Sequence, residues 1–132
     1  MAITLSYSGQ QIELSDRLAW TDEFGWSPVV QTADYTITGA LIVASALRLA
    51  GRPITLESEQ TTAWITRAAC NTLAQWAAVP GAELTLLLRG AARAVMFDNT
   101  RGGFSAKPVW RLLDDAVDAQ QLFLPTLRFL EI

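Results

Sequence analysis

Apolar and polar residues alternate along most of this chain, which is the pattern of half-buried β-strands. Ile3–Tyr7 and Ile12–Leu14 alternate on either side of the turn residues Ser8-Gly9-Gln10, so the chain is predicted to open with a β-hairpin. Ala92–Phe97 follows the turn Arg89-Gly90 and is predicted to pair with the strand before that turn. Three stretches that alternate in the same way are further predicted strands: Ile54–Ser58, Glu83–Leu88 and Gln121–Ile132.

The stretch from residue 29 to residue 49 is also predicted to be extended, in two pieces, Val29–Gln31 and Tyr35–Leu49. Its β-branched residues favour a strand, with a bulge near Gly39 as a variant. The apolar run Leu41-Ile42-Val43 is typical of a buried strand. A helix through Leu41–Leu49 is the alternative, because the alanines and leucines there favour one.

The segment at about 62–78 is predicted to be the helix of the chain. Seven of its residues, all but Thr72 apolar, fall at spacings of one, three or four and line one face: Trp64, Ile65, Ala68, Ala69, Thr72, Leu73 and Trp76. Thr61 or Thr62 can cap its start, and Val79-Pro80-Gly81 ends it. Trp64 and Trp76 are therefore expected in the core, together with Cys70 as a small buried residue.

About eight strands and one inserted helix place the chain in the mostly-β class. A β-sandwich or barrel with the helix covering an edge or an open end fits this pattern. The sequence shows no linker or internal repeat, and 132 residues is a normal size for one domain. We therefore expect residues 1–132 to form a single β-sandwich domain.

The composition argues against catalysis. The chain has no histidine and one cysteine, so it lacks the commonest general base and the commonest metal ligand. Asp22-Glu23 and Asp114-Asp115 are the only adjacent carboxylates, and such neighbours point to opposite faces of a strand or into water. Neither calcium-loop spacing nor a phosphate-binding glycine loop is found. We expect no enzyme activity, catalytic residue, cofactor or metal.

Charge is distributed unevenly along the chain. The net charge of −3 divides into −4 for residues 1–60, +4 for 61–111 and −3 for 112–132. The basic middle has no cluster of Lys and Arg, so sequence-specific nucleic-acid binding is not expected. The longest apolar stretch, Ile37–Ala50, is too short and too polar to span a membrane, and no signal peptide is visible. Segments of opposite sign can provide head-to-tail complementarity between identical subunits.

The order of the segments adds a family resemblance. The predicted hairpin is followed by the aromatic stretch Leu18–Val29, then Gly51-Arg52-Pro53-Ile54-Thr55-Leu56, the helix, and a closing Pro125–Glu131. This order resembles small minor tail proteins of long-tailed bacteriophages, and most of all the N-terminal ring domain of distal tail proteins. The most distinctive pieces are Trp20-Thr21-Asp22-Glu23 and Gly51-Arg52-Pro53. Members of this group are β-sandwich domains with one helix, related to the tail-tube fold.

The resemblance implies a structural role in the virion. The expected assembly is a hexameric ring in the phage tail that joins the tail tube to the baseplate hub around the DNA conduit. Its partners would be further copies of itself, the tail tube protein and the baseplate hub protein, assembled in the bacterial host cytoplasm. A tail tube or tube-terminating protein is an alternative within the same biology. A monomeric carbohydrate-binding β-sandwich and a small carboxylate enzyme are alternatives of other classes.

Four residues of the aromatic stretch are predicted to form a subunit contact: Trp20, Asp22, Glu23 and Trp26. Gly25 and Pro28 mark this stretch as irregular, and tryptophan is favoured at protein interfaces as well as in cores. The alternative is that Trp20 and Trp26 close one end of the sandwich.

Overall fold

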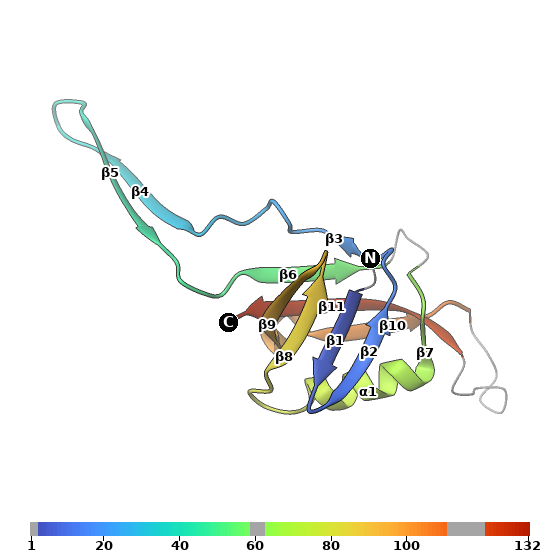
Figure 1. Cartoon of the computed structure of the whole chain (residues 1–132). Coiled ribbons are helices and arrows are strands. Elements are labelled where there is room, and N and C mark those ends of the chain that lie inside the picture. The colour runs from blue at the N-terminus through green and yellow to red at the C-terminus, as the bar shows by residue number, and fades with distance from the viewer. Residues whose placement is uncertain (1–2, 59–62, 111–120) are drawn as a thin grey trace.

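The chain is mostly β, with strands in two antiparallel sheets and one α-helix (Figure 1). This is a computed structural model in which residues 3–58, 63–110 and 121–132 are described. These residues form eleven strands rather than the eight expected, and their sheets do not close into a barrel. The predicted acidic turn at Asp114-Asp115 lies outside the described residues.

The larger sheet carries the body of the molecule. Its strands are β1 (Ile3–Tyr7), β2 (Gln10–Leu14), β3 (Ala19–Trp20), β6 (Pro53–Glu57), β7 (Ile65–Thr66), β8 (Leu84–Leu88), β9 (Ala91–Phe97), β10 (Phe104–Pro108) and β11 (Leu122–Glu131). The order is β2-β1-β8-β9-β11-β6-β3, and β7 and β10 also pair with β11. The long strand β11 is the central strand of this sheet and pairs with four others. Its first half lies between β7 and β10, and its second half lies between β9 and β6.

Two predicted hairpins are confirmed, and the same kind of turn closes both. β1 pairs with β2, and β8 pairs with β9. Ser8 and Gly9 both have positive φ, at 51° and 82°, and Arg89 and Gly90 have φ of 51° and 79°. Two successive residues with positive φ define the type I′ turn, whose twist matches that of the strands it joins.

The core follows from the alternation. Along β8, Leu84, Leu86 and Leu88 are buried while the residues between them are exposed. Phe129 of β11 is fully buried, and its ring centroid lies 4.9 Å from that of Phe97 on β9. Burial of such apolar side chains is the main favourable term in the stability of this sheet.

Helix α1 (Arg67–Ala77) is shorter than the predicted segment at 62–78. Ile65 and Thr66, expected in its first turn, instead form β7 beside Leu122 and Phe123 of β11, as suits β-branched residues at a sheet edge. The expected caps Thr61 and Thr62 lie outside the described residues, and Thr66 caps the helix by accepting a hydrogen bond from the Ala69 N–H at 3.3 Å.

The buried face of α1 is partly as predicted. Cys70, Leu73 and Trp76 are buried, and the Trp76 ring meets Tyr7 of β1 edge-on at 5.8 Å. The placement of Trp64 in the core is wrong, because this side chain precedes the helix and is 42% exposed.

Thr66→Ala is expected to lower the free energy of unfolding by about 1 kcal/mol, because the mutation leaves a helix N–H without its acceptor. Thr72→Ala on the same helix is the matched control, since the Thr72 hydroxyl donates to the Ala68 carbonyl within the helix and caps no end. Its change should stay within about 0.5 kcal/mol. Urea denaturation measures both, and equal effects would contradict a capping role for Thr66.

The smaller sheet is a hairpin of β4 (Val29–Tyr35) and β5 (Leu41–Leu47) that projects from the body as an arm (Figure 1). Strands are confirmed here over the helical alternative. The prediction of a buried strand at Leu41-Ile42-Val43 is wrong, because all three residues are exposed. Gly39 lies in the tip turn with φ of 87°, so it marks the hairpin turn and not a bulge.

Candidate assembly surface

The arm exposes a large amount of apolar surface. Val30, the least exposed of its large apolar residues, has 40% of its surface accessible. Its exposed large apolar residues are Val29, Val30, Tyr35, Ile37, Leu41, Ile42, Val43 and Leu47. Asp34 is the single charged residue between positions 29 and 47. A contiguous exposed apolar surface of this kind marks a site of interaction with another molecule.

The register of the arm divides these residues between two faces. Opposite residues in the hairpin share a face because side chains alternate along each strand. One face carries the apolar pairs Val29 with Leu47, Ala33 with Val43, and Tyr35 with Leu41, together with the polar pair Gln31 with Ser45. The other face carries Val30 with Ala46, Thr32 with Ala44, and Asp34 with Ile42. Because three of its four pairs are apolar, we call the first face the apolar face of the arm.

The backbone of the arm also has free edges. Within the described residues, β4 and β5 pair only with each other, so each strand has one edge of unpaired N–H and C=O groups. An isolated two-stranded hairpin is marginally stable in water. Its apolar faces and open edges are therefore suited to packing and strand pairing against another chain.

Trp20 anchors the chain where the arm begins. It lies on β3 opposite Leu56 of β6 and is half-buried. Three guanidinium carbons lie near its ring centroid, that of Arg52 at 4.9 Å and those of Arg89 and Arg93 at 5.4 Å. Arg52 comes from the segment before β6, and Arg89 and Arg93 come from the β8–β9 hairpin. The Trp20 indole therefore connects the arm's root to β6 and to the β8–β9 hairpin through cation–π contacts.

Asp22 and Glu23 hold the loop that follows Trp20. The Asp22 carboxylate accepts hydrogen bonds from the backbone N–H and the hydroxyl of Thr55, at 2.9 and 3.1 Å. The Glu23 carboxylate forms an ion pair with Arg89, and its backbone carbonyl accepts a bond from Arg52 at 2.7 Å. The sequence suggested that adjacent carboxylates on a loop point into water. Both carboxylates instead bind other residues of the chain.

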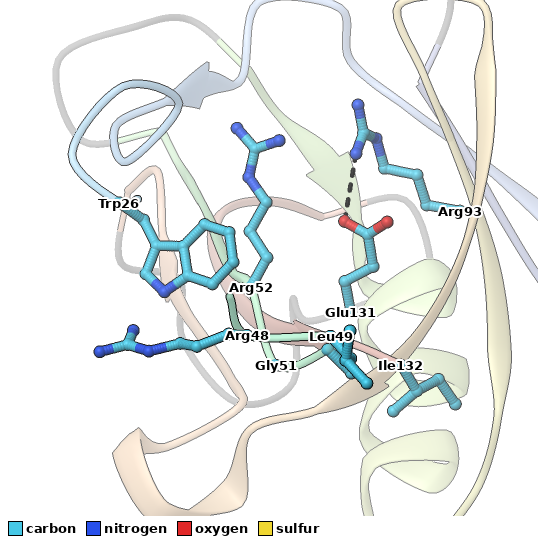
Figure 2. A pocket seen from close by; sticks show the side chains of 9 residues that line it. Trp26, Arg48, Leu49, Gly51, Arg52, Arg93, Glu131 and Ile132 are labelled. Carbon is cyan, nitrogen blue, oxygen red and sulfur yellow. Dashed lines mark hydrogen bonds and ion pairs between the residues drawn. The ribbon is translucent and has the colours of Figure 1, made fainter. Parts of the chain in front are cut away.

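Trp26 and Arg48 mark the base of the arm. The guanidinium carbon of Arg48 lies 5.9 Å from the Trp26 ring centroid, and the Arg48 N–H donates to the Pro28 carbonyl at 2.6 Å. Both residues line a pocket of about 230 Å³. Figure 2 shows them with Arg52, Arg93 and Glu131, which also line it. This pocket lies between the end of the arm and the last residues of β11.

The four predicted contact residues lie at the arm's root, in β3 and in the segment between β3 and β4. The structure gives each of them contacts within the chain, and the contact of all four with a second subunit stays a prediction. The arm itself and the arginines around Trp20 were missed. In the sequence, the arm could have been recognised by the near absence of charged residues from position 29 to position 47.

The single cysteine of the chain, Cys70, lies on the buried face of α1. Burial raises the pKa of the Cys70 thiol to about 11, against the opposing effect of nearby Arg67. The thiol is therefore protonated near neutral pH and is a poor nucleophile. The described residues contain no group of three or more acidic, cysteine or histidine side chains placed to hold a metal ion. No helix among them has the length and apolar character needed to cross a membrane.

Comparison with protein-family models, curated proteins and solved structures gave no match.

Proposed function

We propose that this chain is a structural subunit that assembles with further copies of itself through the β4–β5 arm, as a ring in the tail of a long-tailed bacteriophage. The tail tube and the baseplate hub are its proposed neighbours, around the DNA conduit. A tail tube or tube-terminating protein would use the same self-assembly at another position in the particle.

The observation that carries the proposal is the arm. It exposes apolar side chains on both faces, has one charged residue and leaves both edges unpaired within the described residues. Removing such a surface from water is favourable in proportion to its apolar area. Because the arm projects from one side of the body, it can reach a different surface on a neighbouring copy (Figure 1). Contacts between unlike surfaces generate closed rings when the rotation closes.

The alternatives of other classes have less support. A carbohydrate-binding surface needs open aromatic faces on which sugar rings can stack. Three guanidinium groups lie around Trp20 and one lies against Trp26. A carboxylate enzyme needs two carboxylates facing each other across a cleft. Asp22 and Glu23 are instead bonded to Thr55 and Arg89.

The test is the mass of the full-length protein in solution, measured by light scattering over a concentration series. We expect a mass that rises to a fixed multiple of the 14.4 kDa subunit, with six copies as the multiple that the resemblance implies. A particle with a central opening in electron micrographs would support a ring. A mass of 14.4 kDa at every concentration would contradict self-assembly.

A further inference from the structure

The pocket at the base of the arm has more positive than negative side chains in its wall. Arg48, Arg52 and Arg93 line it, with Glu131 as the carboxylate among its lining side chains (Figure 2). Arg93 pairs with Glu131 at 3.1 Å, whereas neither Arg48 nor Arg52 forms an ion pair among the described residues. We call this site the arginine pocket.

The hydrogen-bond donors of this pocket are also incompletely used. Within the described residues, the Arg48 side chain makes no ion pair or hydrogen bond, and its guanidinium group lies over the Trp26 ring. The Nε atoms of Arg52 and Arg93 are buried and have no acceptor among those residues. Guanidinium groups bind carboxylates through two parallel N–H bonds, and a buried donor without an acceptor is costly. Arg52 and Arg93 lie against Trp20, so the exposed Arg48 is the guanidinium of this pocket that an incoming oxyanion can reach.

The arm supplies a matching group at its opposite end. Asp34 is exposed, lies one residue before the end of β4, and makes no ion pair within the described residues. Its register partner is Ile42, six residues before Arg48 along β5. At about 3.4 Å per residue, Asp34 lies about 20 Å from the arginine pocket of its own chain. It cannot bind that pocket, whereas the Asp34 of another copy can.

We propose that Asp34, near the tip of one subunit's arm, binds in the arginine pocket at the arm root of the next copy. This proposal rests on the proposed function and names the docking site of the arm. Arg48, held by the Trp26 ring, is the main partner of the carboxylate. The contact joins a tip to a root, so each copy gives one and receives one, as a head-to-tail assembly requires.

Charge reversal tests the pairing. Asp34→Arg and Arg48→Asp are each expected to raise the dissociation constant of self-association at least about tenfold, because each places like charges in contact. The double variant Asp34→Arg with Arg48→Asp is expected to recover most of the lost affinity. Glu83→Arg is the matched control for an exposed acidic residue away from the arm, and it should change the dissociation constant less than about twofold.

Sedimentation of the full-length variants over a concentration series measures these constants, and circular dichroism checks that each variant is folded. Single reversals that associate like the unaltered protein would overturn the pocket proposal. Weakened single variants without recovery in the double variant would overturn it as well, since the two residues would then act separately. The arm-less variant, in which Asn-Gly replaces residues 31–45, separates the two proposals. If this variant is monomeric in either case, the proposed function stands and the docking site is wrong. If the arm-less variant still associates, both proposals fail.

Discussion

Replacing residues 31–45 by Asn-Gly is expected to convert the assembled protein into monomers while leaving the nine-stranded sheet folded. Val30 and Ala46 are opposite each other and form the next hydrogen-bonded pair after Pro28 and Arg48, so a two-residue type I′ turn can join them without changing the register. The shortened protein loses the apolar face and both free edges of the arm together. Light scattering at the concentration where the full-length chain assembles is the measurement.

The body should tolerate this change because the arm contributes nothing to its core. The cluster of buried apolar residues draws on most strands of the larger sheet and on the helix, and none of its members lies between positions 29 and 47. The thermal midpoint should therefore shift by no more than about 4 °C, which corresponds to about 1 kcal/mol or less for a domain of this size. Unfolding of the shortened chain would show that the arm stabilises the body of its own subunit.

A matched control separates the loss of the arm from the introduction of a new turn. Ser8→Asn leaves an Asn-Gly pair in the β1–β2 turn, where Ser8 and Gly9 already have positive φ. Asn tolerates this conformation better than Ser, so the fold should be unaffected. This variant should assemble like the unaltered chain. Assembly by the arm-less variant at the same concentrations would contradict the role given to the arm.

The local pattern of apolar and polar residues was sufficient to predict most strands of the larger sheet. The β1–β2 and β8–β9 hairpins could be predicted because alternation defines the strands and the glycine turns define the connection. The end of α1 was predicted within a few residues, since Val79-Pro80-Gly81 cannot continue a helix. The start of α1 was wrong because Ile65 and Thr66 pair with β11, which follows far along the chain. Tertiary pairing there overrides helical spacing.

The arm shows what hydrophobic pattern cannot decide. Leu41-Ile42-Val43 has the composition of a buried strand, yet these residues are exposed in a single chain. An apolar run indicates that the segment will be covered, but the covering group can belong to the same chain or to another one. The pattern therefore located the strand correctly and misassigned its environment. Under the proposed function, this segment would be buried in the assembled ring.

The surroundings of Trp20 were beyond sequence inspection for a different reason. Arg52, Arg89 and Arg93 approach the ring from positions 32 to 73 residues later in the chain. The spacing of residues within one element cannot predict contacts between residues so far apart in the sequence. The aromatic residues did indicate that this stretch packs against other residues, and Trp20 and Trp26 do contact arginines at the arm's root. It did not show that the Asp22 and Glu23 carboxylates are bonded within the chain.

These bonds change how the root should be tested. Reversing the charges of Asp22 and Glu23 would remove the acceptor for Thr55 and place an arginine beside Arg89. Loss of assembly could then follow from a displaced loop and would not isolate a subunit contact. A substitution at Trp20 has a clearer outcome, because this residue joins the root to the sheet and its effect on stability can be measured separately from assembly.

Trp20→Ala is expected to lower the free energy of unfolding by about 3 kcal/mol, the lower end of the range for truncating a buried aromatic residue, because Trp20 is half-buried. Part of the loss comes from the three guanidinium contacts, each worth about 0.5–1 kcal/mol at a partly exposed site. The Trp20 Nε1 atom is buried without an acceptor among the described residues, so its removal offsets some of the cost. Trp20→Phe should therefore cost only about 1 kcal/mol, since it keeps an aromatic ring and removes this N–H.

Phe24→Ala is the control for this experiment, because Phe24 lies in the same loop and is 93% exposed. Its effect on the monomer should be below about 0.5 kcal/mol. Urea denaturation of the arm-less protein measures all three substitutions without interference from assembly. Equal stabilities of the Trp20→Ala and Phe24→Ala variants would show that the guanidinium contacts contribute nothing. The attachment of the arm's root would then rest on the bonds of Asp22 and Glu23 and on the backbone bond from Thr21 to Thr55.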